Sequence, residues 1–271
     1  MKWTRLAAAA ALLTTLTVQP VLADKLDDII ASGVLRCAVV LDFPPMGSRD
    51  ASNNPIGFDV DTCNDLAETL GVTPEYVETP FPDRIPALVS GRADVGVAST
   101  SDTLERAKTI GFSIPYFAFT NVVLTRNDAG IVSYDDLRGK RLGSVAGTFE
   151  AILLEDDMKT WESASTFQGF QAQADVFQAL AQGQIDATVV TSTVAFAIVN
   201  SGNFDNLTIA GDAPYPVDYV SLIALRSEYG LLNYLNLFAH HQVRSGRYQE
   251  LYNKWVGEGE APSLTIPNTY Y

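Results

Sequence analysis

The chain has 271 residues, 47% of them hydrophobic, and a formal net charge of −14 at neutral pH. This length suits one large domain or two small ones, and the apolar content is enough to bury a substantial core. The strong negative charge argues against nucleic acid or an anionic membrane surface as a partner.

The first 23 residues have the pattern of a secretory signal peptide. Lys2 and Arg5 precede an apolar stretch over residues 6–18, and small residues at 21–23 offer a cleavage site. The apolar stretch is too short to cross a bilayer, although an uncleaved anchor is the alternative. No cysteine follows the cleavage point to carry a lipid. We therefore expect a periplasmic mature chain from near Asp24, with a net charge of −16 because the signal removes two cations and no acid.

The two cysteines, Cys37 and Cys63, fall on an expected strand and on the helix that follows it. In an oxidising compartment they either form a disulfide or remain two buried thiols, and the sequence leaves both open. Two cysteines and the neighbouring His240 and His241 do not have metal-ligand spacing. We predict no metal and no cofactor, and we place the histidines on a solvated helix face.

The chain after the signal alternates strands and helices. The expected elements are, in order, strand 34–41, helix 59–70, strand 73–78, helix 83–90 and strand 93–98, then strand 141–145, helix 149–159, helix 174–181 and strand 185–190. Asp59 or Asp61 is expected to cap the first helix. This alternation predicts an α/β fold with mostly parallel sheets covered by helices.

An internal similarity relates the two halves of the chain. Residues 87–99 read ALVSGRADVGVAS and residues 179–191 read ALAQGQIDATVVT, a helix end followed by a glycine and a strand. A separation of 92 residues is too long for a solenoid repeat. The similarity fits two lobes of related build, and chance reuse of a common helix-to-strand junction is the alternative.

Hydroxyl side chains follow both of these matched strands. They are Ser99-Thr100-Ser101 in the first half and Thr191-Ser192-Thr193 in the second. Ligands of open α/β sheets bind beyond the carboxyl ends of the strands. The two clusters therefore predict facing walls of one polar cleft.

Arg106 lies five residues after Ser101 and is the first candidate for binding an anion. A guanidinium offers a carboxylate two parallel hydrogen bonds, so an arginine beside hydroxyls just past a strand end forms a carboxylate pocket. An arginine in such a place is also often a surface residue.

The start of the helix at 149–159 is a second candidate anion site. Helix N-termini present unpaired N–H groups to anions, and Thr148 adds a hydroxyl beside the N–H of Phe149. Thr148 can equally be an N-cap, and the two roles are compatible. Phe43 and Phe81, each beside proline, fit apolar walls for a ligand, with core filling as the alternative.

Motifs of several enzyme classes are missing. The sequence has no G-x-S-x-G elbow, no P-loop and no G-x-G-x-x-G, and no persuasive pair of nucleophile and base. We therefore do not expect an enzyme.

Taken in order, several segments resemble the periplasmic polar amino-acid-binding proteins of ABC importers, the family 3 solute-binding proteins. These segments are GVLRCAVVLDFPPM, GFDVD, RIPALVSGRADV, STSDTLERAKTIGFSIPYF, DLRGKRLGSVAGT and ELYNKW, which lie between Gly33 and Trp255. The resemblance implies a monomeric type II binding protein with two α/β lobes and two hinge crossings, near 119–121 and 214–217. Lobe 1 would hold residues 24–119 and 215–271, and lobe 2 residues 120–214. It also implies a small solute and the importer's membrane subunits as partners.

The resemblance also implies roles for individual residues. Phe43 and Phe81 match the aromatic walls, and Ser99 matches the residue whose carbonyl faces the ligand ammonium. The matches to the carboxylate anchors are Ser101 and Arg106 in lobe 1, and Thr148 with the N–H of Phe149 in lobe 2.

One departure concerns the ligand amine. The family that this chain resembles usually carries an Asp in a D-A-x-x-x-D pattern, but here the sixth residue is Thr191. A buried ammonium without a carboxylate costs several kcal/mol. Either another acid serves, with Asp218 and Asp102 as candidates, or the ligand lacks a free α-amine. Val40 is a second departure, because some relatives place an acid there.

Two alternatives use the same scaffold. Periplasmic cyclohexadienyl dehydratases look similar and need an acid in the cleft, for which Glu150 is the nearest candidate. Its simpler interpretation is a helix-start carboxylate favoured by the dipole. A sensor domain is the third interpretation, for which no output domain follows Tyr271.

Overall fold

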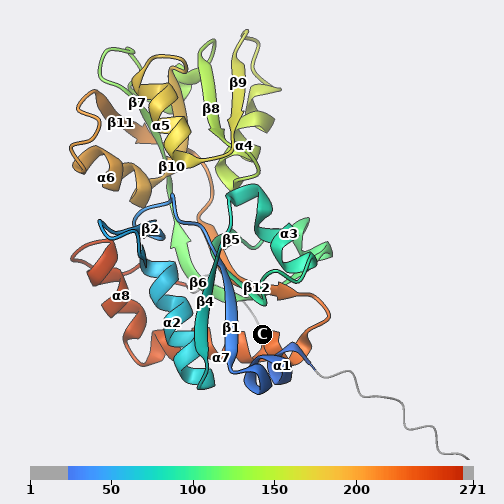
Figure 1. The fold of residues 1–271 in the computed structure, drawn as a ribbon. Helices are drawn as coiled ribbons and strands as arrows, with labels where there is room; N and C mark the ends of the chain where they lie inside the picture. The colour runs from blue at the N-terminus through green and yellow to red at the C-terminus, as the bar shows by residue number, and fades with distance from the viewer. Residues whose placement is uncertain (1–23, 265–271) are drawn as a thin grey trace, which may run out of the picture.

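The computed structural model describes residues 24–264, so the predicted signal peptide lies outside the described residues. The described chain builds two five-stranded sheets, one above the other in Figure 1. We call the part built on the first sheet lobe 1 and the part built on the second sheet lobe 2. This arrangement confirms the predicted two-lobe α/β fold.

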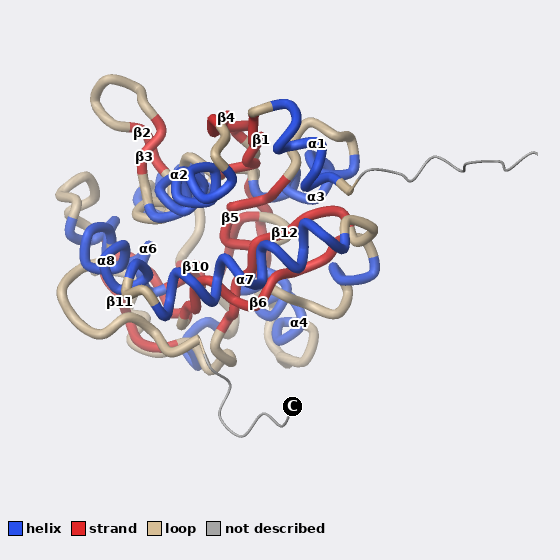
Figure 2. The backbone as a smooth tube through the Cα atoms, turned by 90° about the horizontal axis from the view of Figure 1, so that it is seen from below, coloured by secondary structure: helices blue, strands red, loops and turns tan. Residues whose placement is uncertain are grey.

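The lobe 1 sheet has the strand order β4-β1-β5-β12-β6. Its strands are β4 (Thr73–Glu78), β1 (Val34–Val39), β5 (Val95–Ser101), β12 (Asp218–Leu225) and β6 (Ile110–Phe119). Only β12 runs against the others, because it is antiparallel to both of its neighbours while β4, β1 and β5 are parallel. A short hairpin, β2 (Ser48–Arg49) with β3 (Pro55–Ile56), projects from this lobe (Figure 2).

The lobe 2 sheet repeats this plan with the order β11-β7-β10-β8-β9. Its strands are β11 (Leu207–Asp212), β7 (Asn121–Arg126), β10 (Ala187–Thr191), β8 (Arg141–Val145) and β9 (Thr166–Phe170). Here β7 is the one strand that runs against the others. The chain thus passes between the sheets twice, once from β6 to β7 and once from β11 to β12.

Helices cover the faces of both sheets, as the alternating pattern predicts. Lobe 1 carries α1 (Lys25–Ser32), α2 (Phe58–Leu70), α3 (Arg84–Val89), α7 (Tyr229–Arg244) and α8 (Arg247–Trp255). Lobe 2 carries α4 (Phe149–Met158), α5 (Gln173–Ala181) and α6 (Ser192–Asn200). Seen from below, α7 lies across the side of the lobe 1 sheet that holds β6 and β12 (Figure 2). His240 and His241 are exposed on this helix, as predicted.

The two similar segments occupy equivalent places in the two lobes. Each connects a helix to the middle strand of its sheet, α3 to β5 and α5 to β10. In lobe 1 the carboxylate of Asp94 accepts the main-chain N–H and the guanidinium of Arg36 from the first strand. In lobe 2, Asp186 accepts the same pair of groups from Arg141. The aspartate of the repeated pattern therefore ties two parallel strands together in both halves.

Two sequence expectations change in the structure. Helix α2 begins at Phe58 with Gly57 as its N-cap and no side-chain cap, so the predicted cap at Asp59 or Asp61 is wrong. The carboxylate of Asp59 is buried and used elsewhere, as described below. The open question of the cysteines is resolved as a disulfide, which joins Cys37 in β1 to Cys63 in α2.

Within residues 24–264, no helix combines the length and the apolar character needed to span a bilayer.

Candidate ligand-binding cleft

Seven of the eight predicted site residues line one small cavity between the lobes. The cavity has a volume of about 10 Å³, room for roughly one water molecule. Its lining residues are Phe43, Phe81, Arg84, Ser99, Ser101, Phe119, Thr148, Phe149, Glu150, Thr191 and Asp218. Because the residues come from both lobes, the carboxyl ends of β5 and β10 meet at one site, as the hydroxyl clusters predicted.

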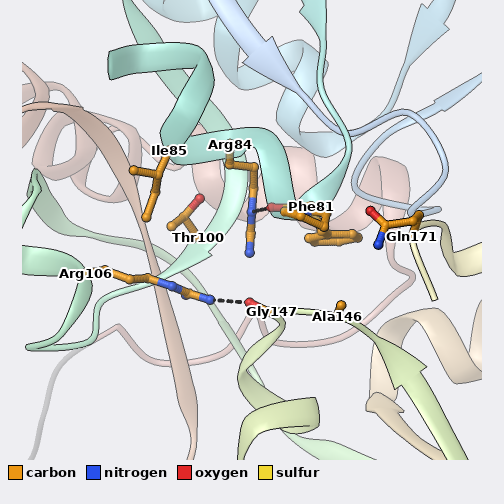
Figure 3. Close-up of a pocket in the computed structure, with 9 residues that line it drawn as sticks. Phe81, Arg84, Ile85, Thr100, Arg106, Ala146, Gly147 and Gln171 are labelled. Carbon is orange, nitrogen blue, oxygen red and sulfur yellow. Dashed lines mark hydrogen bonds between the residues drawn. The ribbon is translucent and has the colours of Figure 1, made fainter. Parts of the chain in front are cut away.

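Arg106, the eighth residue, lines an adjoining cavity of about 250 Å³ that shares Phe81 and Arg84 with the first (Figure 3). Its guanidinium donates from Nη1 to the carbonyl oxygen of Ser101 at 3.0 Å and from Nη2 to that of Gly147 at 2.7 Å. Gly147 belongs to lobe 2, so Arg106 bridges the two lobes.

A second contact holds the lobes together on the other side of the cleft. The Asp42 carboxylate, which follows β1, accepts the main-chain N–H of Gln173 at 2.7 Å. Gln173 is the first residue of α5, whose N-cap Ala172 supplies no side-chain bond. Asp42 therefore caps a helix of the opposite lobe, and the lobes are closed upon each other.

Thr148 is an N-cap, one of the two roles considered from the sequence, and it lies where the other role requires it. It is the N-cap of α4, where its Oγ1 accepts the N–H of Ala151 at 3.4 Å and donates to the carbonyl of Val145 at 3.0 Å. It also lines the cavity, with Phe149 beside it. The rings of Phe43 and Phe81 meet edge to face with centroids 4.8 Å apart. Both side chains are buried, and both also line the cavity.

Ser99 is held in an uncommon backbone conformation at the edge of the cavity. Its φ angle is +44°, in the left-handed region that a non-glycine residue seldom adopts. The Ser99 N–H donates to the Tyr116 hydroxyl, and its own hydroxyl donates to the Asp59 carboxylate at 3.0 Å. Backbone strain of this kind persists where surrounding bonds fix it, and it concentrates at ligand sites.

The carbonyl of Ser99 already has a partner, which the sequence analysis missed. Arg84 is 3% exposed and donates from Nη1 to the carbonyls of Ala98 at 3.0 Å and Ser99 at 2.7 Å. Its Nε donates to the carbonyl of Phe81 at 2.9 Å. A signal for it existed, because Arg84 shares the apolar face of α3 with Ala87 and Leu88, at i+3 and i+4.

Two carboxyl groups also lie in the small cavity. Asp218 accepts the Ser101 hydroxyl at 3.1 Å, and burial, followed by the charge of Glu150, raises the pKa of Asp218 to about 7. Burial also raises the pKa of Glu150. Of the two acids named for the ligand amine, Asp218 lines the cavity, whereas Asp102 is exposed and lines neither cavity.

Thr191, which stands in the sequence where the resemblance predicts an Asp, lines the small cavity. It is 3% exposed, and its Oγ1 has no hydrogen-bond partner among the residues the structure describes. It precedes α6 as its N-cap without a side-chain cap bond. A buried hydroxyl left unpaired is costly, so this group is available to a ligand.

Two α/β lobes with a polar cleft between them define a type II periplasmic-binding-protein fold. The chain belongs to the bacterial extracellular solute-binding proteins, family 3, whose model matches residues 35–258.

Individual relatives agree with this family. The chain is 26% identical over 231 residues to a protein of Neisseria gonorrhoeae named probable histidine-binding protein, covering 83% of this chain and 84% of the relative. The crystal structure of a mutant of ArgBP from T. maritima superposes with a TM-score of 0.78 at 30% identity, covering 85% of this chain and 98% of that one. An ancestral amino acid-binding protein, described as a precursor of cyclohexadienyl dehydratase, gives a TM-score of 0.77 at 27% identity, with coverage of 85% and 99%.

Proposed function

We propose that this protein is an extracytoplasmic binding protein of an ABC importer that captures an amino acid or a related small carboxylate between its lobes. The observation that carries the proposal is the interlobe cleft, which is lined by Arg106, Ser101 and Thr148. The chain that forms this cleft belongs to a family of solute-binding proteins. Relatives are named as binding proteins for arginine, histidine, cystine and glutamine. The protein is accordingly a binding protein and not an enzyme.

The finer parts of the proposal follow from the sequence and the fold. A cleaved signal at 1–23 would deliver the chain to the periplasm, where a monomer would dock on the importer's membrane subunits. We propose that residues 24–119 with 215–271, and residues 120–214, move as the two rigid lobes. The sheet topology supports these boundaries. The first boundary lies between β6 and β7, and the second lies between β11 and β12, where the chain passes from one sheet to the other.

Ligand should favour the closed arrangement. A carboxylate held by Arg106 of lobe 1 and the α4 start of lobe 2 interacts more strongly with closed than with open protein, which shifts the population toward closure. We expect a smaller radius of gyration by small-angle X-ray scattering when ligand saturates the ligand-stripped protein. Asp42→Ala, which removes the interlobe hydrogen bond to Gln173, should enlarge the ligand-free radius. Identical scattering with and without saturating ligand would contradict the hinge mechanism.

The substitution Thr191→Asp should strengthen binding of ordinary L-amino acids by about tenfold or more. A charged acceptor forms a hydrogen bond about twice as strong as a neutral one and offsets desolvation of the ammonium. Affinity for an amine-free or N-substituted ligand should fall or stay unchanged. Calorimetry against the twenty amino acids measures both effects, with Thr191→Val as the uncharged control of similar shape.

Variants of Asp218 test the prediction that no carboxylate of this protein pairs with a ligand amine. Tight binding of a standard amino acid by the natural protein, lost in Asp218→Asn, would show that the acid has moved to lobe 1. Tight binding that survives the loss of both Asp102 and Asp218 would contradict the account altogether.

A further inference from the structure

The larger cavity beside the cleft is lined by two arginines and by no acid. Its lining residues are Phe81, Pro82, Arg84, Ile85, Thr100 and Arg106 from lobe 1, with Ala146, Gly147 and Gln171 from lobe 2. Figure 3 shows the guanidinium groups of Arg84 and Arg106 directed into it from neighbouring elements. At about 250 Å³ it has room for a group of several heavy atoms, and it opens beside the proposed ligand site.

Both guanidinium groups have donors to spare. All of their hydrogen bonds go to main-chain carbonyl oxygens, and neither group forms an ion pair with any residue in 24–264. The Nη2 of Arg84 donates to none of these residues. A buried cation without an anionic partner is unfavourable, and a ligand carboxylate is the partner that a guanidinium fits best.

One strand brings the two groups to the same cavity. Arg84 is fixed on the carbonyl of Ser99 and Arg106 on that of Ser101, two residues further along β5. Both side chains line the cavity of about 250 Å³, so one short-chain diacid can reach both guanidinium groups.

The neighbouring acids lie outside the larger cavity. Glu150 and Asp218 line the small cavity, and their charges oppose the burial that lowers the pKa of both arginines, but neither acid forms an ion pair with Arg84 or Arg106 among residues 24–264. Burial, together with the charge of Arg106, lowers the pKa of Arg84 to about 9, so Arg84 remains a cation at neutral pH.

We propose that the solute carries two carboxylates on a short carbon chain, one bound by Arg106 and the other by Arg84. The inference rests on the proposed function and narrows its ligand to the C4–C5 diacids. Arg84 then sets specificity, because it demands a negative charge where a neutral ligand would leave it unpaired.

An α-amine is not required of such a ligand. The Ser99 carbonyl that would accept an ammonium hydrogen bond already faces the Arg84 cation, which repels an ammonium, and Thr191 offers no charge. Acidic amino acids and amine-free diacids share the two carboxylates. Comparing the two groups of ligands separates these sources.

The test is calorimetry of the full mature protein, freed of carried-over ligand by unfolding and refolding. The probes are glutarate, succinate, L-glutamate and L-aspartate, with L-glutamine and glutaramate as matched amides that lack one charge. We expect at least one diacid to bind 100-fold or more tightly than its amide. Glutarate binding more tightly than L-glutamate identifies an amine-free ligand, and the reverse identifies an acidic amino acid, and either result supports the two-carboxylate assignment.

Arg84→Gln should reduce this preference for diacid over amide to less than tenfold, and Arg84→Lys should keep part of it. Arg92→Gln is the matched control, because Arg92 is exposed just after α3 and lines neither cavity. A purely structural Arg84 would weaken all ligands alike and leave the preference unchanged, which would overturn the proposal. The preference of the natural protein is itself a test if Arg84→Gln does not fold.

Two further outcomes separate a failure of the diacid inference from a failure of the proposed function. A neutral or basic amino acid that binds more tightly than every diacid would overturn the inference and leave the proposed function standing. Folded protein that binds no amino acid and no small carboxylate would overturn the proposed function, and the inference with it.

Discussion

Arg106→Ala is expected to weaken ligand binding by about 2–5 kcal/mol, roughly 30-fold to several thousand-fold, while the protein remains folded. The loss is large because the Arg106 guanidinium lies partly buried between the lobes. In the alanine variant a ligand carboxylate bound there has no charged partner. The same substitution removes the bond to Gly147, so closure should also become less favourable. Calorimetry gives the affinity, and circular dichroism checks the fold.

Arg106→Lys separates charge from geometry. Lysine keeps the positive charge but cannot make two parallel hydrogen bonds to a carboxylate, so binding should still weaken, by less than in the alanine variant. Natural affinity in Arg106→Ala would contradict the carboxylate assignment. Natural affinity in Arg106→Lys alone would show that charge is sufficient.

Loss of the disulfide is expected to cost about 3 kcal/mol of unfolding free energy. Cys37 and Cys63 are 26 residues apart in sequence, and a crosslink over such a loop restricts the unfolded chain by about this amount. The bond also ties β1, a buried strand of the lobe 1 sheet, to α2, which packs against it. The double variant Cys37→Ala/Cys63→Ala should therefore unfold at a clearly lower urea concentration.

Reduction of the natural protein with dithiothreitol is the matched control for the cysteine variant, because it breaks the bond without removing sulfur from the core. Both cysteines are fully buried, so truncation to alanine adds a packing loss of its own. Equal urea midpoints for oxidised and reduced natural protein would contradict a stabilising role for the bond.

The sequence predicted the architecture well because strand and helix periodicity is a local property. Strands β4 and β8 have the predicted bounds, 73–78 and 141–145, and the alternation of elements correctly indicated sheets covered by helices. Strand β5 was predicted to end at Ala98 but runs through Ser101, since its three hydroxyl residues are buried and Thr100 and Ser101 pair with β12.

The site was predicted in part. The residues that were missed or misassigned share one physical cause, which is that their partners are distant in the sequence. Arg84 was missed because the groups that bury it, the carbonyls of Ala98 and Ser99, come from a strand 14 and 15 residues later. Asp59 was taken for a helix cap because local pattern favours an acid there. Its partners in the fold, Ser99 and Tyr116, lie 40 and 57 residues away.

The return of β12 to the first sheet has a consequence for the order in which the chain acquires its structure. All five strands of the lobe 2 sheet lie between residues 121 and 212, whereas the lobe 1 sheet lacks β12, between β5 and β6, until residue 225. A chain that is synthesised from its N-terminus can complete the sheet of lobe 2 while the sheet of lobe 1 still lacks β12. Until β12 arrives, β5 and β6 present unpaired edges, which are the places where extended chains pair wrongly. Lobe 2 can therefore complete its sheet before lobe 1, although lobe 1 begins earlier in the sequence. The risk of incorrect strand pairing falls on lobe 1, until β12 is in place.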